Sequence, residues 1–545
     1  MTDAIALLVV VPIVLSLAPI AVGKAWNRSG WVAAALAALV HLGLSLTVAA
    51  RVFATGSFSY AVGDYAPPFG IELVADGVSA TLVVLVSAVT LAVVLYARAA
   101  GPHTSGFYSG LLLLTAGISG VFVTGDLFNL YVFIEITGLA TYALVATGRS
   151  PAAAMASLKY LLVGTIGASL YLLGVGYLYI STGTLNMADL AATLPSVGYD
   201  SPLVLTGFGL LVVGLAVKAA LFPLHTWQPG AYAESPDSVT AYISALVSTA
   251  AAYALFRVVY GVFTPAFDAA VPFALDALVV LSVVSVVVGS VLAVLQSDLK
   301  RMLAYSSVAQ FGLVIAGFAV ANTTAVTGGL IHLVGHAIMK AGLFVGVGAL
   351  AGVAGGRTVD DFAGVAERAP IVSAAFAVLA FALVGVPPAV GFAGKWHIVL
   401  GAVEAGRWGV ASVAIVSTLL TLAYFARVVE RMYFRDAPAP EAAVDAEASA
   451  DAASDGVLAS DGGNDANAAD APDASDTPDA PDALDAPDAA DAADAPDAPD
   501  APDAPTISTE ARLVVVAAAV GAVVLGLFAT DLVAVFEPVL EVYFE

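Results

Sequence analysis

The chain has 545 residues, of which 60% are hydrophobic and only 11% are charged, and its mean hydropathy is +0.94. Soluble proteins carry charges on about a quarter of their residues, so this composition excludes an ordinary soluble globular fold. Apolar stretches of about twenty residues, each long enough to cross a bilayer as a helix, recur along the sequence. The sequence therefore predicts an all-α, polytopic membrane protein.

Missing residue types and motifs exclude several kinds of chemistry. The sequence has no cysteine, so it lacks the ligands of an iron–sulfur cluster of the usual kind. It has no Gly-rich nucleotide-binding loop between a strand and a helix. We therefore expect no cofactor, no bound metal and no redox centre in this chain, and we expect it to act on ions.

One segment accounts for most of the net charge of −24. Residues 436–510 contain 21 of the 43 acidic residues and no Lys or Arg, and an aspartate recurs at every third position from Asp470 to Asp503. Like charges keep such a low-complexity stretch extended, so we expect a disordered cytoplasmic loop. It is either a solvated spacer or a binding tail, and its acidity suits the saline cytoplasm of a halophile.

Fourteen apolar stretches predict membrane helices. Their expected ranges are 3–22, 31–50, 77–97, 107–124, 127–147, 157–180, 203–222, 238–261, 271–296, 302–320, 325–352, 370–392, 402–426 and 511–535. The first stretch has no basic leader before its apolar run, which argues against a cleaved signal peptide.

The distribution of Lys and Arg predicts the orientation of these helices. With both termini outside, three bases fall on the outer side: Arg51, Arg257 and Arg407. Thirteen fall on the cytoplasmic side or at its edge: Lys24, Arg28, Arg98, Arg149, Lys159, Lys300, Arg301, Arg357, Arg368, Arg427, Arg431, Arg435 and Arg512. We therefore expect a plasma-membrane protein with external termini and a cytoplasmic acidic loop.

The stretch "AVKAALFPLHTW" places Lys218 deep in an apolar helix, about 22 Å from its start at Leu203. A buried ammonium costs several kcal/mol unless it is paired or hydrated, and such residues mark ion pathways. Pro223 removes the partner of the Ala219 carbonyl. Because a free carbonyl at membrane depth must face protein or water, the break predicts local hydration of the lysine.

Glu135, in "DLFNLYVFIEITGL", is the expected partner of Lys218. Desolvation favours a neutral lysine and a nearby carboxylate favours the charged form, so a lysine with a changing neighbour can load and unload a proton. The alternative is a static ion pair that fixes helix packing.

In "GGLIHLVGHAIMKAGLF", His332, His336 and Lys340 follow one another at i, i+4 and i+8, and they form one stripe about 12 Å long. Histidine titrates near physiological pH, so the stripe is typical of a proton relay. Structural hydrogen bonding and a zinc site remain the alternatives.

In "ALVGVPPAVGFAGKWHIVL", Pro387, Pro388, Gly391 and Gly394 are expected to interrupt a helix just before Lys395. Interrupted helices at matching places in two halves are typical of transporter repeats. In "QSDLKRML", Asp298, Lys300 and Arg301 are interpreted as an anchor at a cytoplasmic helix end.

Together, the motifs "DLFNLYVFIEI", "KAALFPLHTW", "SDLKRMLAYSSVAQFG", "HLVGHAIMKAGLF" and "GVPPAVGFAGKW" resemble a family of antiporter-like membrane subunits. This family is shared by Mrp-type multisubunit Na+/H+ antiporters and the proton-pumping subunits of respiratory complex I. The likeness is strongest to the D-type subunit of the Mrp antiporters.

The resemblance implies a division of the chain into three N-terminal helices and two inverted five-helix repeats, with helices seven and twelve broken. The implied segments are 1–100, the repeats 107–261 and 271–426, the acidic loop 436–510 and a last helix at 511–535. It also implies a proton half-channel in each repeat and a central polar axis.

The same resemblance implies the roles of the buried charges. Glu135 and Lys218 match an essential glutamate–lysine pair, His332, His336 and Lys340 match the central relay, and Lys395 matches the terminal base. Three features depart from the family: Thr249 stands where relatives carry a lysine, Gly230 and Tyr232 stand where they carry an aspartate and a histidine, and the long acidic loop is an addition. Thr249 and Tyr232 are the candidates for an alternative link.

The expected function is proton translocation as one membrane subunit of a multisubunit cation (Na+)/H+ antiporter. Its expected partners are other membrane subunits, the lipid bilayer and protons, with Na+ left open. The first alternative is the same role in a complex I-like quinone dehydrogenase or a membrane-bound hydrogenase. The second is a structural subunit whose buried charges are remnants.

Overall fold

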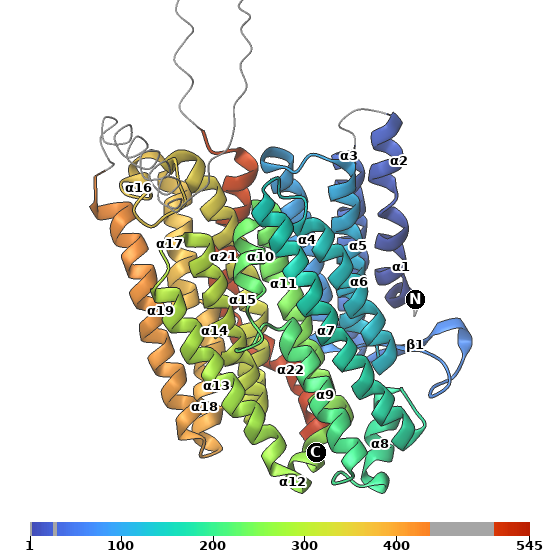
Figure 1. Ribbon diagram of the computed structural model, residues 1–545. Helices are drawn as coiled ribbons and strands as arrows, with labels where there is room; N and C mark the ends of the chain where they lie inside the picture. Colours follow the sequence, from blue (N-terminus) through green and yellow to red (C-terminus); the bar gives the residue numbers. More distant parts are fainter. Residues whose placement is uncertain (1–2, 26–29, 437–505, 545) are drawn as a thin grey trace, which may run out of the picture. The chain divides into compact units, whose positions relative to one another are not determined.

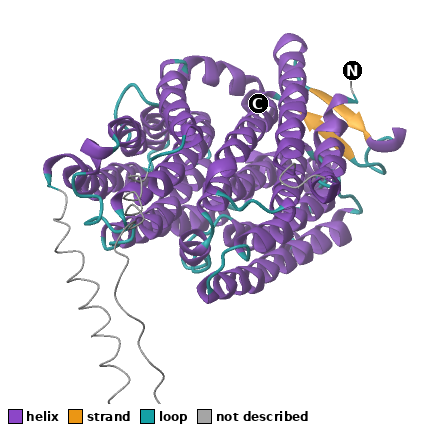
Figure 2. Ribbon diagram, turned by 90° about the horizontal axis from the view of Figure 1, so that it is seen from above, coloured by secondary structure: helices purple, strands orange, loops and turns teal. Residues whose placement is uncertain are grey.

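The computed structural model describes residues 3–25, 30–436 and 506–544, and nearly all of its regular structure is helical (Figure 1). In these ranges the strands form one antiparallel hairpin, β1 (Phe58–Ala61) with β2 (Glu72–Ala75). Figure 2 shows the hairpin at the periphery of the helices, near the N-terminus. The predicted all-α class is confirmed, apart from this hairpin in a connection that the sequence left unassigned. Most of the predicted acidic loop lies outside the described residues.

The helices are named in chain order. The first group is α1 (Ala4–Leu15), α2 (Ala18–Ala25), α3 (Gly30–Thr55), the short helix η1 (Val62–Asp64), α4 (Gly77–Ala100), α5 (Ser105–Val123), α6 (Leu127–Val145), α7 (Pro151–Thr182) and α8 (Met187–Val197). The second group is α9 (Pro202–Lys218), α10 (Gln228–Glu234), α11 (Asp237–Phe256), the π-helical turn η2 (Arg257–Phe263), α12 (Thr264–Ala270), α13 (Pro272–Val294), α14 (Leu299–Ala319), α15 (Thr323–Ala354) and α16 (Val365–Arg368). The last group is α17 (Pro370–Val384), α18 (Val390–Glu404), α19 (Trp408–Phe434), α21 (Thr509–Leu527) and α22 (Ala529–Phe544).

Among the described residues, 12 helical segments are long and apolar enough to cross a membrane, and they lie at the predicted positions. The other two predicted spans, 203–222 and 370–392, correspond to the shorter apolar helices α9 and α17. Each of these is followed by a non-helical turn and a second helix, α10 or α18. The expectation of broken helices at positions seven and twelve is therefore confirmed.

Local backbone chemistry explains both breaks. α9 ends at Lys218, and Pro223 then prevents the helix from continuing because it has no N–H. α17 ends where Gly385 adopts φ +100°, a left-handed conformation that suits glycine. Pro387 and Pro388 follow directly. Gly391 and Gly394 were expected to take part in this break, but they lie inside α18.

Gly391 and Gly394 instead allow helices to approach closely. A Cβ atom on Gly394 would lie 2.6 Å from the Cβ of His332 in α15, and one on Gly391 would lie 2.0 Å from the carbonyl oxygen of Ala382 in α17. No larger side chain fits at either position. These glycines therefore bring α18, which carries Lys395, against the histidine stripe.

Two other predicted ranges differ from the structure. The span predicted at 511–535 is divided between α21 and α22, which meet at Phe528. The span predicted at 402–426 begins later, at Trp408, because α18 continues to Glu404 and Gly406 turns the chain with φ +70°.

The central helices are α11, α14 and α15. In the segment from α11 to α12, every residue of the most apolar 18-residue stretch is buried. In α14, nearly every residue of such a stretch is buried. Peripheral helices such as α7, α13 and α19 instead expose large apolar side chains, including Leu162, Val280 and Leu419, as expected of surfaces that face lipid. The polar residues on the central helices are thus enclosed by protein.

Candidate functional site

Lys218 and its predicted partner Glu135 lie together inside the protein. Lys218 is the last residue of α9, is buried, and its Nζ lies 3.6 Å from Oε1 of Glu135 on α6. The same ammonium donates a hydrogen bond of 3.0 Å to the hydroxyl of Tyr142, about two turns further along α6. Tyr142 was not predicted from the sequence. The lysine therefore has one charged and one neutral partner, both on α6.

Glycines make room for this arrangement. A Cβ on Gly138 would lie 3.1 Å from Nζ of Lys218, and a Cβ on Gly164 of α7 would lie 2.0 Å from the Tyr142 hydroxyl. A cavity of about 20 Å³, lined by Lys218, Gly138 and Tyr160 among others, adjoins the ammonium. That volume is enough for about one water molecule. The structure thus provides the small hydratable space that the sequence predicted.

We expect replacement of Tyr142 by phenylalanine to lower proton transport about threefold to tenfold, because the lysine keeps Glu135 but loses its hydroxyl acceptor. Gly164→Ala should have a similar effect, since it displaces the same hydroxyl. Gly176→Ala on the same helix is the matched control, because nothing lies within 4 Å of its added Cβ. Transport rates of the three variants in membrane vesicles check this, and equal rates in all three would contradict it.

The last carbonyls of α9 accept hydrogen bonds from backbone and side chains, and those of Leu215, Ala216 and Val217 accept from backbone N–H groups of the turn that follows. The indole N–H of Trp227 donates to the carbonyl of Val217 at 2.9 Å, and the hydroxyl of Ser248 donates to the carbonyl of Lys218 at 3.4 Å. Trp227 also stacks on Tyr160 with 3.8 Å between ring centroids. Protein groups therefore satisfy these carbonyls, and the predicted hydration concerns the lysine beside them.

The predicted link from Lys218 towards the second half is present only in part. Gln228, at the start of α10, donates to the hydroxyl of Tyr232 at 3.0 Å and to that of Ser248 at 3.3 Å. Thr249 takes no part, because its hydroxyl donates to the Ala245 carbonyl in its own helix. Gln228 and Ser248 replace it, and neither was predicted.

Beyond Tyr232 the path becomes aromatic. The Tyr232 ring packs edge-on against Phe344 of α15, with 5.8 Å between centroids, and Nζ of Lys340 lies 5.9 Å from the centre of the Phe344 ring. A phenyl ring carries no exchangeable proton. Lys218 and Lys340 are therefore connected through polarisable groups and packing, and no continuous hydrogen-bond chain joins them among the described residues.

The central stripe is fully buried on α15 and faces α14. Nε2 of His332 lies 2.7 Å from the side-chain oxygen of Gln310, and Lys340 donates to the carbonyl of Leu303 at 2.6 Å and to the hydroxyl of Ser306. Gln310 and Ser306 were not singled out from the sequence, although both stand in the motif "LAYSSVAQFG".

His336 differs from its neighbours. Its ring packs 4.7 Å from that of Phe311, and neither ring nitrogen has a hydrogen-bond partner among the described residues. Unpartnered buried polar groups are rare and often functional. The zinc alternative gains no support, since no group of three or more His, Asp or Glu within the described ranges could hold a metal ion.

Lys395 lies on α18 and contacts the end of α17 across the break. Its Nζ donates to the carbonyls of Leu383 at 2.9 Å and Val384 at 3.0 Å. The last carbonyls of a helix lack intrahelical partners and carry the negative end of the helix dipole, so they stabilise an ammonium. Lys218 also stands at such a break, but it relies on a carboxylate.

The two bases of the "SDLKR" motif, both interpreted as an anchor, differ in burial. Arg301 is exposed and lies 3.3 Å from Glu234, and Asp298 caps the start of α14. Lys300 is buried, and its charge is balanced there by Asp237, the first residue of α11. Its Nζ lies 3.1 Å from a carboxylate oxygen of that residue. The sequence signal for an anchor is the same at both positions, and the carboxylate that distinguishes them is distant in the chain.

Comparison with known proteins confirms the resemblance drawn from the motifs. A family model described as NADH:quinone oxidoreductase/Mrp antiporter, transmembrane, matches residues 124–421, which include the site residues described above. The chain is 43% identical to the N-type subunit of the NADH-quinone oxidoreductase of Desulforudis audaxviator, over 80% of this chain and 87% of that protein.

The chain is also 32% identical to the D-type subunit of the Na(+)/H(+) antiporter of Bacillus subtilis, over 71% of this chain and 78% of that protein. A chain in the structure of the Mrp complex from a Dietzia species superimposes with a TM-score of 0.81 at 26% identity, covering 100% of this chain and 98% of that one. The fold, the buried charges and these matches agree: the chain belongs to the transmembrane family shared by NADH:quinone oxidoreductases and Mrp antiporters.

Proposed function

We propose that the chain is the proton-translocating membrane subunit of a multisubunit cation (Na+)/H+ antiporter, with other membrane subunits as its partners. The observation that carries this is the pair of buried Lys218 and half-buried Glu135 at a broken helix, beside a cavity large enough for water. Ionisable residues at membrane depth mark ion pathways. The likeness to the D-type subunit of a Na(+)/H(+) antiporter and to the Mrp complex supports the antiporter assignment.

In this proposal Glu135 controls whether Lys218 holds its proton, His332, His336 and Lys340 store and pass protons, and Lys395 exchanges them at the far end. The two halves correspond to the repeats 107–261 and 271–426. Because Phe344 interrupts the link after Tyr232, the halves communicate electrostatically, and the charge on Lys218 influences Lys340 without handing it a proton.

The test is proton transport by the assembled complex in vesicles. Glu135→Ala and Lys218→Ala should each lower the rate about tenfold, which corresponds to the loss of about 1.4 kcal/mol of stabilisation along the pathway. Complex recovered in normal amount shows that assembly is unaffected. Full activity in both variants contradicts the proposal.

The second candidate is the same role in a complex I-like dehydrogenase or a membrane-bound hydrogenase. It is favoured by the higher identity to the N-type subunit of an NADH-quinone oxidoreductase. The buried charges are the same in both cases, and only the partners differ. Mass spectrometry of the subunits that copurify with the chain decides: antiporter subunits support the first candidate, and quinone-site or iron–sulfur subunits support the second.

We further propose that the protein lies in the plasma membrane with both termini outside, and that the acidic segment serves a saline cytoplasm. The basic residues near the helix ends support this orientation. If instead the buried charges are structural remnants, apolar replacements along the α15 stripe will leave transport unchanged.

A further inference from the structure

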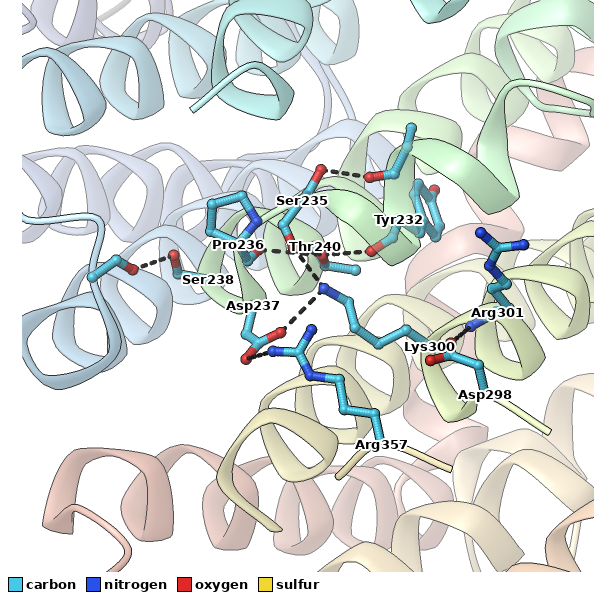
Figure 3. A network of polar contacts seen from close by, with 12 residues as sticks. Tyr232, Ser235, Pro236, Asp237, Ser238, Thr240, Asp298, Lys300, Arg301 and Arg357 are labelled. Atoms are coloured by element: carbon cyan, nitrogen blue, oxygen red, sulfur yellow. Dashed lines mark hydrogen bonds and ion pairs between the residues drawn. The ribbon is translucent and has the colours of Figure 1, made fainter. Parts of the chain in front are cut away.

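Asp237 joins two cations that come from another part of the chain (Figure 3). Its Oδ1 lies 3.1 Å from Nζ of Lys300, the second residue of α14, and its Oδ2 lies 3.1 Å from Nη2 of Arg357, which follows α15. Lys300 also donates to the carbonyl of Ser235 at 2.6 Å. None of these contacts was predicted, and the proposed pathway described above does not use them.

These three side chains form a gradient of exposure. The side chain of Lys300 is 2% exposed, that of Asp237 is 16% exposed and that of Arg357 is 44% exposed. The carboxylate therefore has one oxygen towards a buried ammonium and the other towards a guanidinium in contact with water. It stands at the boundary between the aqueous phase and the interior.

α14 leads from this boundary to the central stripe. Lys300, Leu303 and Ser306 follow one another at intervals of three along the helix, and Lys340 donates to both the Leu303 carbonyl and the Ser306 hydroxyl. The rise from Lys300 to Ser306 is about 9 Å. The polar groups that hold Lys340 thus lie on the same helix as the buried lysine of the Asp237 cluster.

α15 leads to the same place. Gly348 lies two turns beyond Lys340 on that helix, about 12 Å along its axis. A Cβ atom there would lie 2.6 Å from Oδ2 of Asp237 and 2.7 Å from the hydroxyl of Tyr96 on α4. Asp237 therefore packs near the C-terminal end of α15, the helix that also carries the histidine stripe. Gly348 leaves room for it there.

We propose that Asp237 is the group through which the central stripe exchanges protons with the aqueous phase at this end of the protein. The Asp237 carboxylate takes one proton from hydronium, releasing water, and becomes a neutral acid. It then gives this proton to the neutral amine of Lys300, after Lys300 has passed its own proton to the neutral amine of Lys340 past the Ser306 hydroxyl. Only O–H and N–H bonds form and break.

The surrounding charges set the order of these steps. Lys300 and Arg357 face the carboxylate directly, and the Tyr96 hydroxyl approaches it from α4. Nearby, Asp298 and Arg301 lie at the start of α14, and Arg301 pairs with Glu234 at the end of α10. The Lys300 ammonium is buried and has Asp237 as its counter-ion. In this scheme Asp237 takes up its proton after Lys300 has passed its own to Lys340, so that no buried ammonium is left without a counter-ion.

This inference rests on the proposed function, and one assay separates the two. Proton transport by the assembled complex in vesicles is measured against the pH on the Asp237 side. Asp237→Asn should lower the rate about tenfold or more and flatten its pH dependence, and Asp237→Glu should restore most of both. Asp360→Asn is the matched control, because Asp360 is an exposed carboxylate three residues after Arg357 that pairs with Arg431 instead, and it should behave as wild type.

A wild-type rate and pH profile for Asp237→Asn overturns the inference. An Asp237→Glu variant that assembles but is as slow as the asparagine variant also overturns it, because Asp237 then only holds the helices together. If Glu135→Ala and Lys218→Ala slow transport while Asp237→Asn does not, only this inference fails.

If Asp237→Asn does not assemble, Arg357→Gln tests the same idea. It removes the guanidinium that contacts Oδ2 of Asp237, so the rate of transport and its pH profile should both change, and a wild-type rate and profile overturn the inference.

Discussion

Replacement of Lys340 by alanine is expected to lower proton transport by the assembled complex about 100-fold or more, the scale of a lost acid–base group. Lys340 is fully buried on α15. In the proposed pathways it lies between the two histidines of the stripe and the Asp237 cluster. The other buried lysines stand at the ends of these proposed pathways. Loss of the central one therefore has the largest effect on transport.

The fold should tolerate this change. The Leu303 carbonyl that accepts from Lys340 also accepts from the Ser306 hydroxyl of its own helix, at 2.8 Å. Removing the ammonium thus leaves neither group without a partner. Lys340→Arg sharpens the test, because an arginine keeps the charge but does not release its proton, and it should be as inactive as alanine.

Lys159→Ala is the control for this experiment. Lys159 lies exposed on α7. Its replacement also removes a lysine from an apolar helix, but it leaves the buried side chains of the protein unchanged. The measurement is the initial rate of proton uptake into vesicles that contain equal amounts of assembled complex. If Lys340→Ala and a His332→Leu/His336→Leu variant both transport at the wild-type rate, the relay is wrong and the structural alternative holds.

The positions of the spans and the three buried lysines could be predicted because both signals are local. A twenty-residue apolar run and a charge within it are visible without any knowledge of packing. The breaks beside Lys218 and Lys395 were equally visible, since proline acts on its own helix. The β1–β2 hairpin was missed because each strand has four residues, too few for an alternating pattern.

The neutral partners could not be predicted from such patterns. A tyrosine, serine or glutamine in an apolar helix is usually part of the packing, and its role depends on how the helix is rotated. Tyr142 reaches Lys218 and Gln310 reaches His332 only because α6 and α14 turn those faces inward. Thr249 donates its hydroxyl proton to the Ala245 carbonyl of its own helix, a direction that the sequence does not reveal.

The burial and pairing of two basic residues could not be predicted, because their partners are far away in sequence. Lys300 was interpreted as an anchor and Arg257 as a base of the outer side, yet both are buried and paired. The carboxylate of Arg257 is Asp76, 181 residues earlier, and that of Lys300 is Asp237, 63 residues earlier. A helix-end cation looks the same in sequence whether it faces water or a buried carboxylate.

Replacement of Arg257 by alanine should destabilise the folded chain by about 3–5 kcal/mol, because it leaves the Asp76 carboxylate buried without its counter-ion. Nη2 of Arg257 lies 2.5 Å from Oδ2 of Asp76, and its other nitrogens donate to the hydroxyls of Tyr253 and Tyr543 at 2.6 Å each. Tyr543 belongs to α22, so the guanidinium also fastens the end of the chain to the central helices.

Asp76 has a second role that allows the charge effect to be isolated. Its Oδ1 accepts from the backbone of Val78 and Ser79 and caps α4, and asparagine can replace aspartate at a cap. Asp76→Asn alone leaves Arg257 unpaired and should be destabilising. The double variant Asp76→Asn/Arg257→Met removes both charges while keeping the cap, and it should recover part of the loss.

The measurement is the temperature at which half of the purified complex loses its native assembly, compared across these variants. Arg407→Ala is the control, because its pair with Asp276 is short, at 2.7 Å, but 40% and 47% exposed, and such pairs contribute about 0–1 kcal/mol. A drop as small for Arg257→Ala as for Arg407→Ala contradicts the prediction. If the double variant recovers stability, the uncompensated charge of Asp76 causes the destabilisation. If it does not recover, the lost contacts with the tyrosines that hold α22 cause it.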